Sequence, residues 1–130
     1  DQWLKTQCAV VIGRGETAGK PIFDYLSSIG CATSVVHSKT KNPKEVVKKM
    51  TIVVSCVGKE RVVTADMVTP ETILISVGIW RDNEGKLHGD YNEEEIAGKV
   101  AFYTPTPGGV GPVNVACLME NTVLAAQNTL

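Results

Sequence analysis

A glycine-containing turn between an apolar run and a helical pattern constrains this chain more than any other part of its sequence. The β-branched run at residues 10–12 leads into Gly13, Gly15 and Gly19, and Pro21 then opens a stretch with helical spacing. Glycine lets the backbone approach a ligand closely, and a helix start offers unpaired N–H groups and a positive dipole end. A strand, a glycine turn and a helix in this order predict a phosphate cradle. The alternative is that the glycines form only a turn.

Apolar runs alternate with amphipathic stretches along the rest of the chain. Strands are predicted at residues 8–12, 32–36, 52–57, 73–77 and 100–103, and helices at 21–29, 43–50, 92–98 and 113–128. Nearly continuous apolar strands separated by helices are typical of a parallel sheet covered on both faces. We therefore predict an α/β fold with one three-layer, doubly wound, Rossmann-like parallel sheet, and a ligand at the carboxyl ends of its strands.

Several local signals add detail to this prediction. Asn42 and Asn92 are predicted helix N-caps, each with a glutamate three residues later, and Pro43 takes a first helical position. Residues 81–86 are predicted to form an exposed hairpin or loop, and residues 64–67 a turn or short helix. Residues 104–112 are predicted to be irregular because proline and glycine are dense there. The last helix places four apolar residues on one face: Ala116, Met119, Val123 and Ala126.

Length and charge exclude several classes of protein. A chain of 130 residues fits one domain. Its net charge of -1, with both signs interspersed, argues against a nucleic-acid or membrane-surface partner. No apolar run approaches the ~20 residues that a membrane span needs.

The first seven residues lack both a methionine and a signal-peptide pattern, which favours the interior of a longer chain. The four cysteines contain no C-x-x-C pair, so reduced structural thiols, no metal site and a cytosol-like compartment are expected.

The glycine spacing narrows the kind of phosphate ligand. Gly13-x-Gly15-x-x-x-Gly19 is one residue longer than the common dinucleotide fingerprint. A P-loop is excluded, since five residues rather than four separate Gly13 from Gly19, and Pro21 stands where a magnesium-binding hydroxyl is needed. The sequence therefore favours a dinucleotide over nucleotide hydrolysis.

The end of the second predicted strand indicates which dinucleotide. An NAD site usually carries an acidic residue there, whereas residues 37–41 read His-Ser-Lys-Thr-Lys, with hydroxyls, cations and no carboxylate. Such a tip suits the 2′-phosphate of NADP, and Arg14 could add a bidentate contact. A solvated polar loop is the alternative. His37 is expected to be structural and His88 incidental.

The sequence offers a binding platform without a catalytic set. No Ser/His/Asp set, paired carboxylate or metal-ligand cluster is evident, so neither a catalytic residue nor a metal site is assigned. The glycines within residues 104–112 would let a flat ligand lie against the backbone, facing the first glycine turn. A rigid connection before the last helix is the alternative.

A series of motifs then points to one family. In order they are residues 11–14, 19–21, 37–40, Val77-Gly78-Ile79 with Arg81, Gly89-Asp90, residues 104–112 (TPTPGGVGP) and residues 119–122. In order and spacing these motifs resemble the methylenetetrahydrofolate dehydrogenase/cyclohydrolase family, over essentially the whole chain. Four residues differ from the family's usual pattern: Gly15 for serine, Trp80 for asparagine, Thr106 for valine and Asn114 for threonine.

The resemblance implies an enzyme of one-carbon folate metabolism. Such enzymes oxidise 5,10-methylenetetrahydrofolate by hydride transfer to NADP, and most then hydrolyse the methenyl product to 10-formyltetrahydrofolate. It further implies the site residues: Gly13, Arg14 and Gly15 at the cofactor phosphates, Ser38 near the 2′-phosphate, Ile79 at the cofactor through its backbone, and Pro107, Gly108, Gly109 and Val110 between nicotinamide and folate.

The family's catalytic lysine and tyrosine belong to a preceding folate-binding domain that this chain lacks. Residues 1–130 are therefore expected to be an NAD(P)-binding domain that is inactive alone and shares a folate substrate with that absent domain. The resemblance also implies a homodimer in the cytoplasm, with an organelle as the alternative. Two other functions stay open: a monofunctional NAD-dependent dehydrogenase of the same family, and a non-catalytic nucleotide-sensing Rossmann module.

Overall fold

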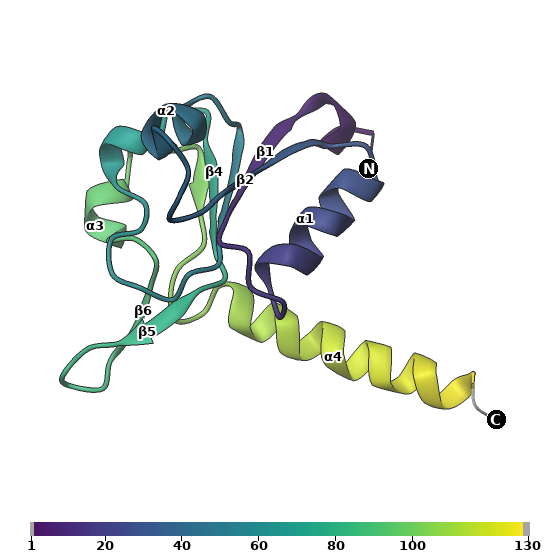
Figure 1. Cartoon of the computed structure of the whole chain (residues 1–130). Helices are drawn as coiled ribbons and strands as arrows, with labels where there is room; N and C mark the ends of the chain where they lie inside the picture. Colours follow the sequence, from purple (N-terminus) through teal and green to yellow (C-terminus); the bar gives the residue numbers. More distant parts are fainter. Residues whose placement is uncertain (1, 129–130) are drawn as a thin grey trace.

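A five-stranded parallel sheet forms the centre of the protein, as the computed structural model of residues 2–128 shows (Figure 1). Its strands are β1 (Cys8–Ile12), β2 (Ala32–Val36), β3 (Ile52–Ser55), β4 (Ile73–Ser76) and β7 (Phe102–Tyr103). They lie in the order β2-β1-β3-β4-β7, and every neighbouring pair is parallel. The strand order reverses direction at β1, so the predicted doubly wound, Rossmann-like α/β fold is confirmed.

Helices cover both faces of this sheet. The α1 helix (Gly19–Ser28) packs on one face, whereas α2 (Pro43–Lys48), the short 3-10 helix η2 (Ala65–Met67) and α3 (Glu93–Ile96) lie on the other (Figure 1). Successive strand residues alternate between the two cores, so Val53 packs on the α2 side and Val54 on the α1 side. A second 3-10 helix, η1 (Leu4–Thr6), precedes β1. The predicted hairpin is present, with strands β5 (Ile79–Arg81) and β6 (Leu87–Gly89).

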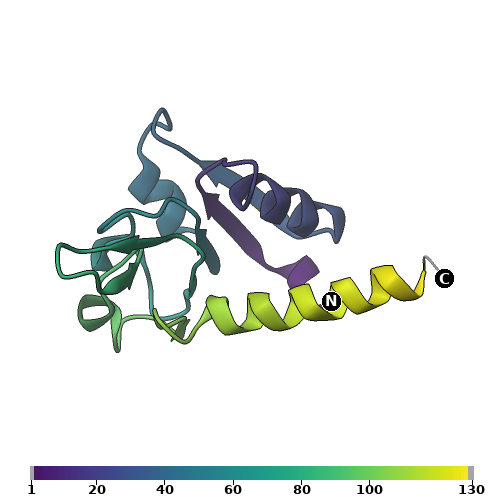
Figure 2. The same cartoon turned by 90° about the horizontal axis from the view of Figure 1, so that it is seen from below.

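Helix α4 (Val110–Gln127) leaves the sheet instead of covering it. It projects away from the domain (Figures 1 and 2), and none of its described residues is buried. On the α1 face, β3 and β4 therefore border an open, apolar groove of about 410 Å³, lined among others by Trp3, Ile22, Ile52, Ile75 and Val110. The apolar face predicted for the last helix has no partner within residues 2–128. Over the same residues, no helix is long and apolar enough to cross a membrane.

Some predicted boundaries were wrong. Helix α1 begins two residues before Pro21, and β3, β4 and β7 are shorter than predicted. Helix α4 begins at Val110, so the last three residues of the predicted irregular stretch are helical. Pro112 is tolerated because the first N–H groups of a helix have no intrahelical acceptor.

The two predicted N-caps behave differently. At Asn92 the side-chain oxygen accepts a hydrogen bond from the backbone N–H of Glu94 at 2.9 Å, so this cap is confirmed. Asn42 precedes α2 but has left-handed backbone angles (φ 51°, ψ 54°), and its side chain makes no cap hydrogen bond. The capping box predicted there was wrong, because asparagine tolerates this conformation and the side chain then points elsewhere. Pro43 takes the first turn of α2 as predicted.

Candidate functional site

The glycine turn joins the ends of three strands. The N–H of Gly13 donates to the Val36 carbonyl at 2.8 Å, and the N–H of Cys56 donates to the Ile12 carbonyl at 2.8 Å. Gly13 has a positive φ of 105°, and a Cβ there would lie 2.9 Å from the Cys56 carbonyl oxygen. Only glycine fits this position, because both the conformation and the close approach exclude a side chain.

The other two glycines of the turn differ in their surroundings. A Cβ on Gly19, the first residue of α1, would lie less than 3.0 Å from the carbonyl oxygen of Gly13. Gly15 is exposed, and no atom lies within 4 Å of the place its Cβ would take. No side-chain hydrogen bond caps α1 at Ala18, so the helix start stays open to an anion. The geometry of the turn thus requires Gly13 and Gly19 but not Gly15.

A pocket of about 620 Å³ opens beside this turn, at the carboxyl ends of β1, β2 and β3. Three of the predicted cofactor residues line it together: Gly13, Arg14 and Ser38. Its opposite wall consists of residues after β3, including Val57 and Lys59. In open α/β sheets a ligand binds in a crevice of this kind, where the strand order reverses.

The pocket is lined by four cationic side chains: Arg14, Lys44, Lys59 and Arg61. Lys44 lies 2.5 Å from Asp66, and Arg61 is paired with Glu95. The other two cations have no ion-pair partner among residues 2–128. Hydrogen bonds from Lys44 and Thr64 lower the pKa of Asp66 to about 2. Two cations without a carboxylate partner give this pocket a positive field that suits a phosphate.

The turn after β2 holds itself together with its own side chains. His37 Nδ1 accepts from the backbone N–H of Lys39 at 3.2 Å, and Thr40 Oγ1 accepts from the N–H of His37 at 3.0 Å. His37 is therefore the structural histidine that the sequence predicted. Ser38 is exposed and lines the pocket, with no carboxylate in the turn beside it.

The remaining predicted site residues lie outside this pocket. Ile79 is 58% exposed, and its carbonyl oxygen lies 3.0 Å from the place of a Cβ on Gly58, at the neighbouring strand end. Residues 107–110 do not line the pocket either, and Val110 borders the apolar groove instead. This loop thus does not form part of the pocket beside the glycine turn.

Sequence reasoning did not assign Lys44 or Lys59 to the pocket. Lys59 follows β3 and Lys44 follows β2, and neither carries a motif of its own. Their place in the sequence could have indicated them, because residues that follow parallel strands lie at the same edge of the sheet. Asp90 was noted only as part of a motif, although it is completely buried at this edge.

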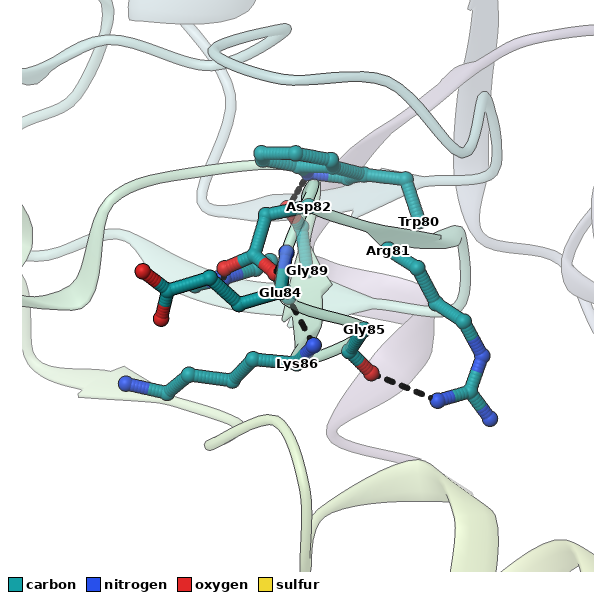
Figure 3. A network of polar contacts seen from close by, with 8 residues as sticks. Trp80, Arg81, Asp82, Glu84, Gly85, Lys86 and Gly89 are labelled. Carbon is teal, nitrogen blue, oxygen red and sulfur yellow. Dashed lines mark hydrogen bonds and ion pairs between the residues drawn. The ribbon is translucent and has the colours of Figure 1, made fainter.

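The hairpin β5–β6 carries a network of polar contacts (Figure 3). The Trp80 ring stacks on His88 at 4.8 Å between centroids, and its Nε1–H donates to the Gly89 carbonyl at 2.8 Å. His88 Nε2 lies 2.7 Å from Asp82 Oδ2, and this hydrogen bond lowers the pKa of the Asp82 carboxyl. A second cavity of about 400 Å³ lies beside the hairpin. Trp80 thus connects the two strands of the hairpin.

A parallel, doubly wound sheet with a cationic pocket and a glycine turn at its carboxyl edge defines a nucleotide-binding domain. The family model described as "Tetrahydrofolate dehydrogenase/cyclohydrolase, NAD(P)-binding domain" matches residues 2–130. The chain belongs to this family.

The known relatives that the chain matches are longer than the chain itself. It is 45% identical to "Bifunctional protein FolD" of Campylobacter concisus over 92% of this chain and 42% of the relative, and 48% identical to its namesake from Wolbachia over 95% and 42%. Among solved structures, the FolD enzyme of Campylobacter jejuni has a TM-score of 0.92 at 38% identity. The match covers 98% of this chain and 45% of the Campylobacter jejuni chain. The Trypanosoma brucei enzyme, "complexed with NADP cofactor and inhibitor", has a TM-score of 0.88 at 32% identity. This match covers 97% of this chain and 45% of the Trypanosoma brucei chain. The chain thus spans less than half the length of these relatives.

Proposed function

We propose that this chain is the NADP-binding domain of a bifunctional 5,10-methylenetetrahydrofolate dehydrogenase/5,10-methenyltetrahydrofolate cyclohydrolase. The observation that carries the proposal is the pocket that unites Arg14, Ser38 and Lys59. Arg14 and Lys59 have no ion-pair partner among residues 2–128, and residues 37–41, directly after β2, include no carboxylate. A 2′-phosphate needs cations and hydroxyls, whereas a free ribose hydroxyl is usually bound by a carboxylate.

The residues of the site then have separate tasks. Gly13 and Gly19 let the backbone approach the phosphates, and the exposed Gly15 leaves room beside them. Arg14 and Ser38 would bind the 2′-phosphate. When bound, the nicotinamide supplies the hydride chemistry, while the protein orients it and excludes water. Ile79 would contact the cofactor through its backbone, and Pro107, Gly108, Gly109 and Val110 would lie between nicotinamide and folate.

The proposal assigns the catalytic groups and the folate contacts to a folate-binding domain elsewhere in the longer protein. The apolar groove between α1 and β4 and the uncovered helix α4 support this, because both are surfaces that a neighbouring domain would bury. This chain alone should therefore bind NADP without turning over folate. We further propose a homodimer that works in the cytoplasm, on the basis of the family resemblance.

A mass measurement of the native protein tests the domain assignment. Its chain should be about twice as long as this one, since the relatives are matched over 42% of their length. A native chain of this length alone would overturn the enzyme assignment and leave a nucleotide-sensing module.

Cofactor titration tests the function itself. Calorimetry of the 130-residue chain should show tighter binding of NADP than of NAD. Arg14→Ala and Ser38→Ala should each weaken NADP binding about tenfold while NAD changes little, because each removes a charge-assisted contact to the 2′-phosphate. Lys99→Ala serves as the control, since Lys99 is exposed and does not line the pocket. Equal affinity for both cofactors in the parent chain would refute the phosphate assignment and favour the NAD-dependent alternative.

A further inference from the structure

Asp90 is a buried carboxylate that contacts three consecutive backbone N–H groups. It lies directly after β6 and has no exposed surface. Its Oδ2 accepts hydrogen bonds from the Ser55 hydroxyl at 2.6 Å and from the N–H of Val57 at 2.9 Å. Its Oδ1 accepts from the N–H of Gly58 at 2.7 Å and of Lys59 at 3.0 Å. Four donors thus converge on one carboxylate.

The three N–H groups form an anion nest that the chain fills by itself. Successive backbone N–H groups that point to one side make a concavity for an anion. Here the anion is the Asp90 carboxylate, so the conformation of residues 57–59 depends on this residue. Without Asp90, three N–H groups would lose their acceptor inside the protein, and the loop would have to rearrange to satisfy them.

Asp90 also ties this loop to the end of β4. Its N–H donates to the Ser76 hydroxyl at 2.9 Å, and that hydroxyl donates to the Gly78 carbonyl at 3.0 Å. A Cβ on Gly78 would collide with the Asp90 carboxylate and with the N–H of Gly58. The ends of β3 and β4 therefore meet on Asp90.

The outer side of the loop forms a wall of the cationic pocket. Val57 and Lys59 line that pocket, whereas Asp90 does not. The Lys59 side chain is exposed and has no ion-pair partner among residues 2–128, so its direction depends on the backbone that carries it. We propose that Asp90 is a positioning residue, which fixes the loop at 57–59 and thereby holds Lys59 against the phosphate groups of the bound dinucleotide.

This inference rests on the proposed function but predicts something that the function does not require. Coulomb's law alone predicts that loss of the Asp90 charge strengthens binding of an anionic ligand. Positioning predicts the opposite, because the neutral Asp90→Asn side chain would turn an N–H₂ group or a weaker acceptor toward the three N–H groups. The sign of the change therefore separates the two roles.

The experiment is a double-mutant cycle in the 130-residue chain, with NADP as the probe. Lys59→Ala and Asp90→Asn should each weaken NADP binding about tenfold, and the double variant should lose little beyond Lys59→Ala. Thr72→Val is the control: Thr72 is equally buried but lies at the amino end of β4, so NADP affinity should stay unchanged even where stability falls. Unfolding of each variant is followed by circular dichroism.

Three outcomes would overturn the inference: an unchanged affinity in Lys59→Ala, an equal or tighter affinity in folded Asp90→Asn, or a double variant whose loss is the product of the two single losses. If Asp90→Asn does not fold, Lys59→Ala still tests the inference, because an unchanged NADP affinity in that variant would overturn it. A tenfold loss in Arg14→Ala with no loss in Lys59→Ala would refute this inference while supporting the proposed function. A parent chain that binds no NADP would refute the proposed function itself.

Discussion

The carbonyl oxygen of Gly13 occupies the space into which a side chain on Gly19 would point. Gly19→Ala should therefore push the glycine turn away from the start of α1. We expect the free energy of unfolding to fall by about 1–3 kcal/mol, the usual cost of overpacking, and NADP binding to weaken. Urea denaturation and calorimetry measure the two effects.

Gly15→Ala is the matched control for this prediction. Its Cβ would meet nothing within 4 Å, so the free energy of unfolding should stay within about 0.5 kcal/mol of the parent. Equal losses in the two variants would contradict the close approach of Gly13 and Gly19.

The Lys44–Asp66 pair should shape the acid limb of the stability curve. The pKa of Asp66 is lowered from 3.8 to about 2, first by the hydrogen bond from Lys44. A lowered folded-state pKa stabilises the fold above the unfolded value, and this stabilisation is lost as the pH falls from about 4 to about 2. Both side chains are exposed, so the effect is small. In both Asp66→Asn and Lys44→Met, the urea midpoint should change less between about pH 4 and pH 2 than it does in the parent chain. If the midpoint of both variants depends on pH as in the parent, the pair does not stabilise the fold.

Trp80 should stabilise the hairpin in two separable ways. Trp80→Phe keeps a ring that can stack on His88 but loses the hydrogen bond to Gly89, which should cost about 1 kcal/mol. Trp80→Ala should lose the stacking as well, about 0.5–1.5 kcal/mol more. Denaturant unfolding compares the two variants, and equal losses would show that the stacking contributes nothing.

Two leucines test where the core ends. Leu74 has no exposed surface, and Leu74→Ala should lower the free energy of unfolding by about 2–5 kcal/mol. Leu118 on α4 is 62% exposed, and Leu118→Ala should change it by no more than about 0.5 kcal/mol. Denaturation at several protein concentrations measures both. A large, concentration-dependent loss at Leu118 would instead show that α4 packs against a second copy.

The strands were predictable where the sequence carries the signal locally. The β1 and β2 strands match their predicted ends to the residue, because β-branched runs stop there at a glycine and at a polar turn. The partner of α4 could not be predicted in this way. A helical pattern shows which residues share a face, but it does not show what that face meets.

The site was predictable only in part for a related reason. Arg14 and Ser38 follow predicted strands, and the structure places both in one pocket. The role of Asp90 depends on donors that lie 31 to 35 residues away in the sequence, and no local spacing encodes that contact. Asn42 failed as a cap because its side-chain direction follows a backbone conformation that composition does not reveal.

One wall of the cationic pocket comes from residues within 12–44, at the ends of β1 and β2, and the other comes from residues within 57–67, after β3. A dinucleotide bound there would contact both walls, and would so connect two segments of the chain whose strands otherwise pair in the sheet. At a hundredfold excess over its Kd it would add about 2.7 kcal/mol to the free energy of unfolding. The lifetime of the protein in a cell would then follow the supply of its cofactor, so that depletion of the nucleotide also lowers the amount of the protein.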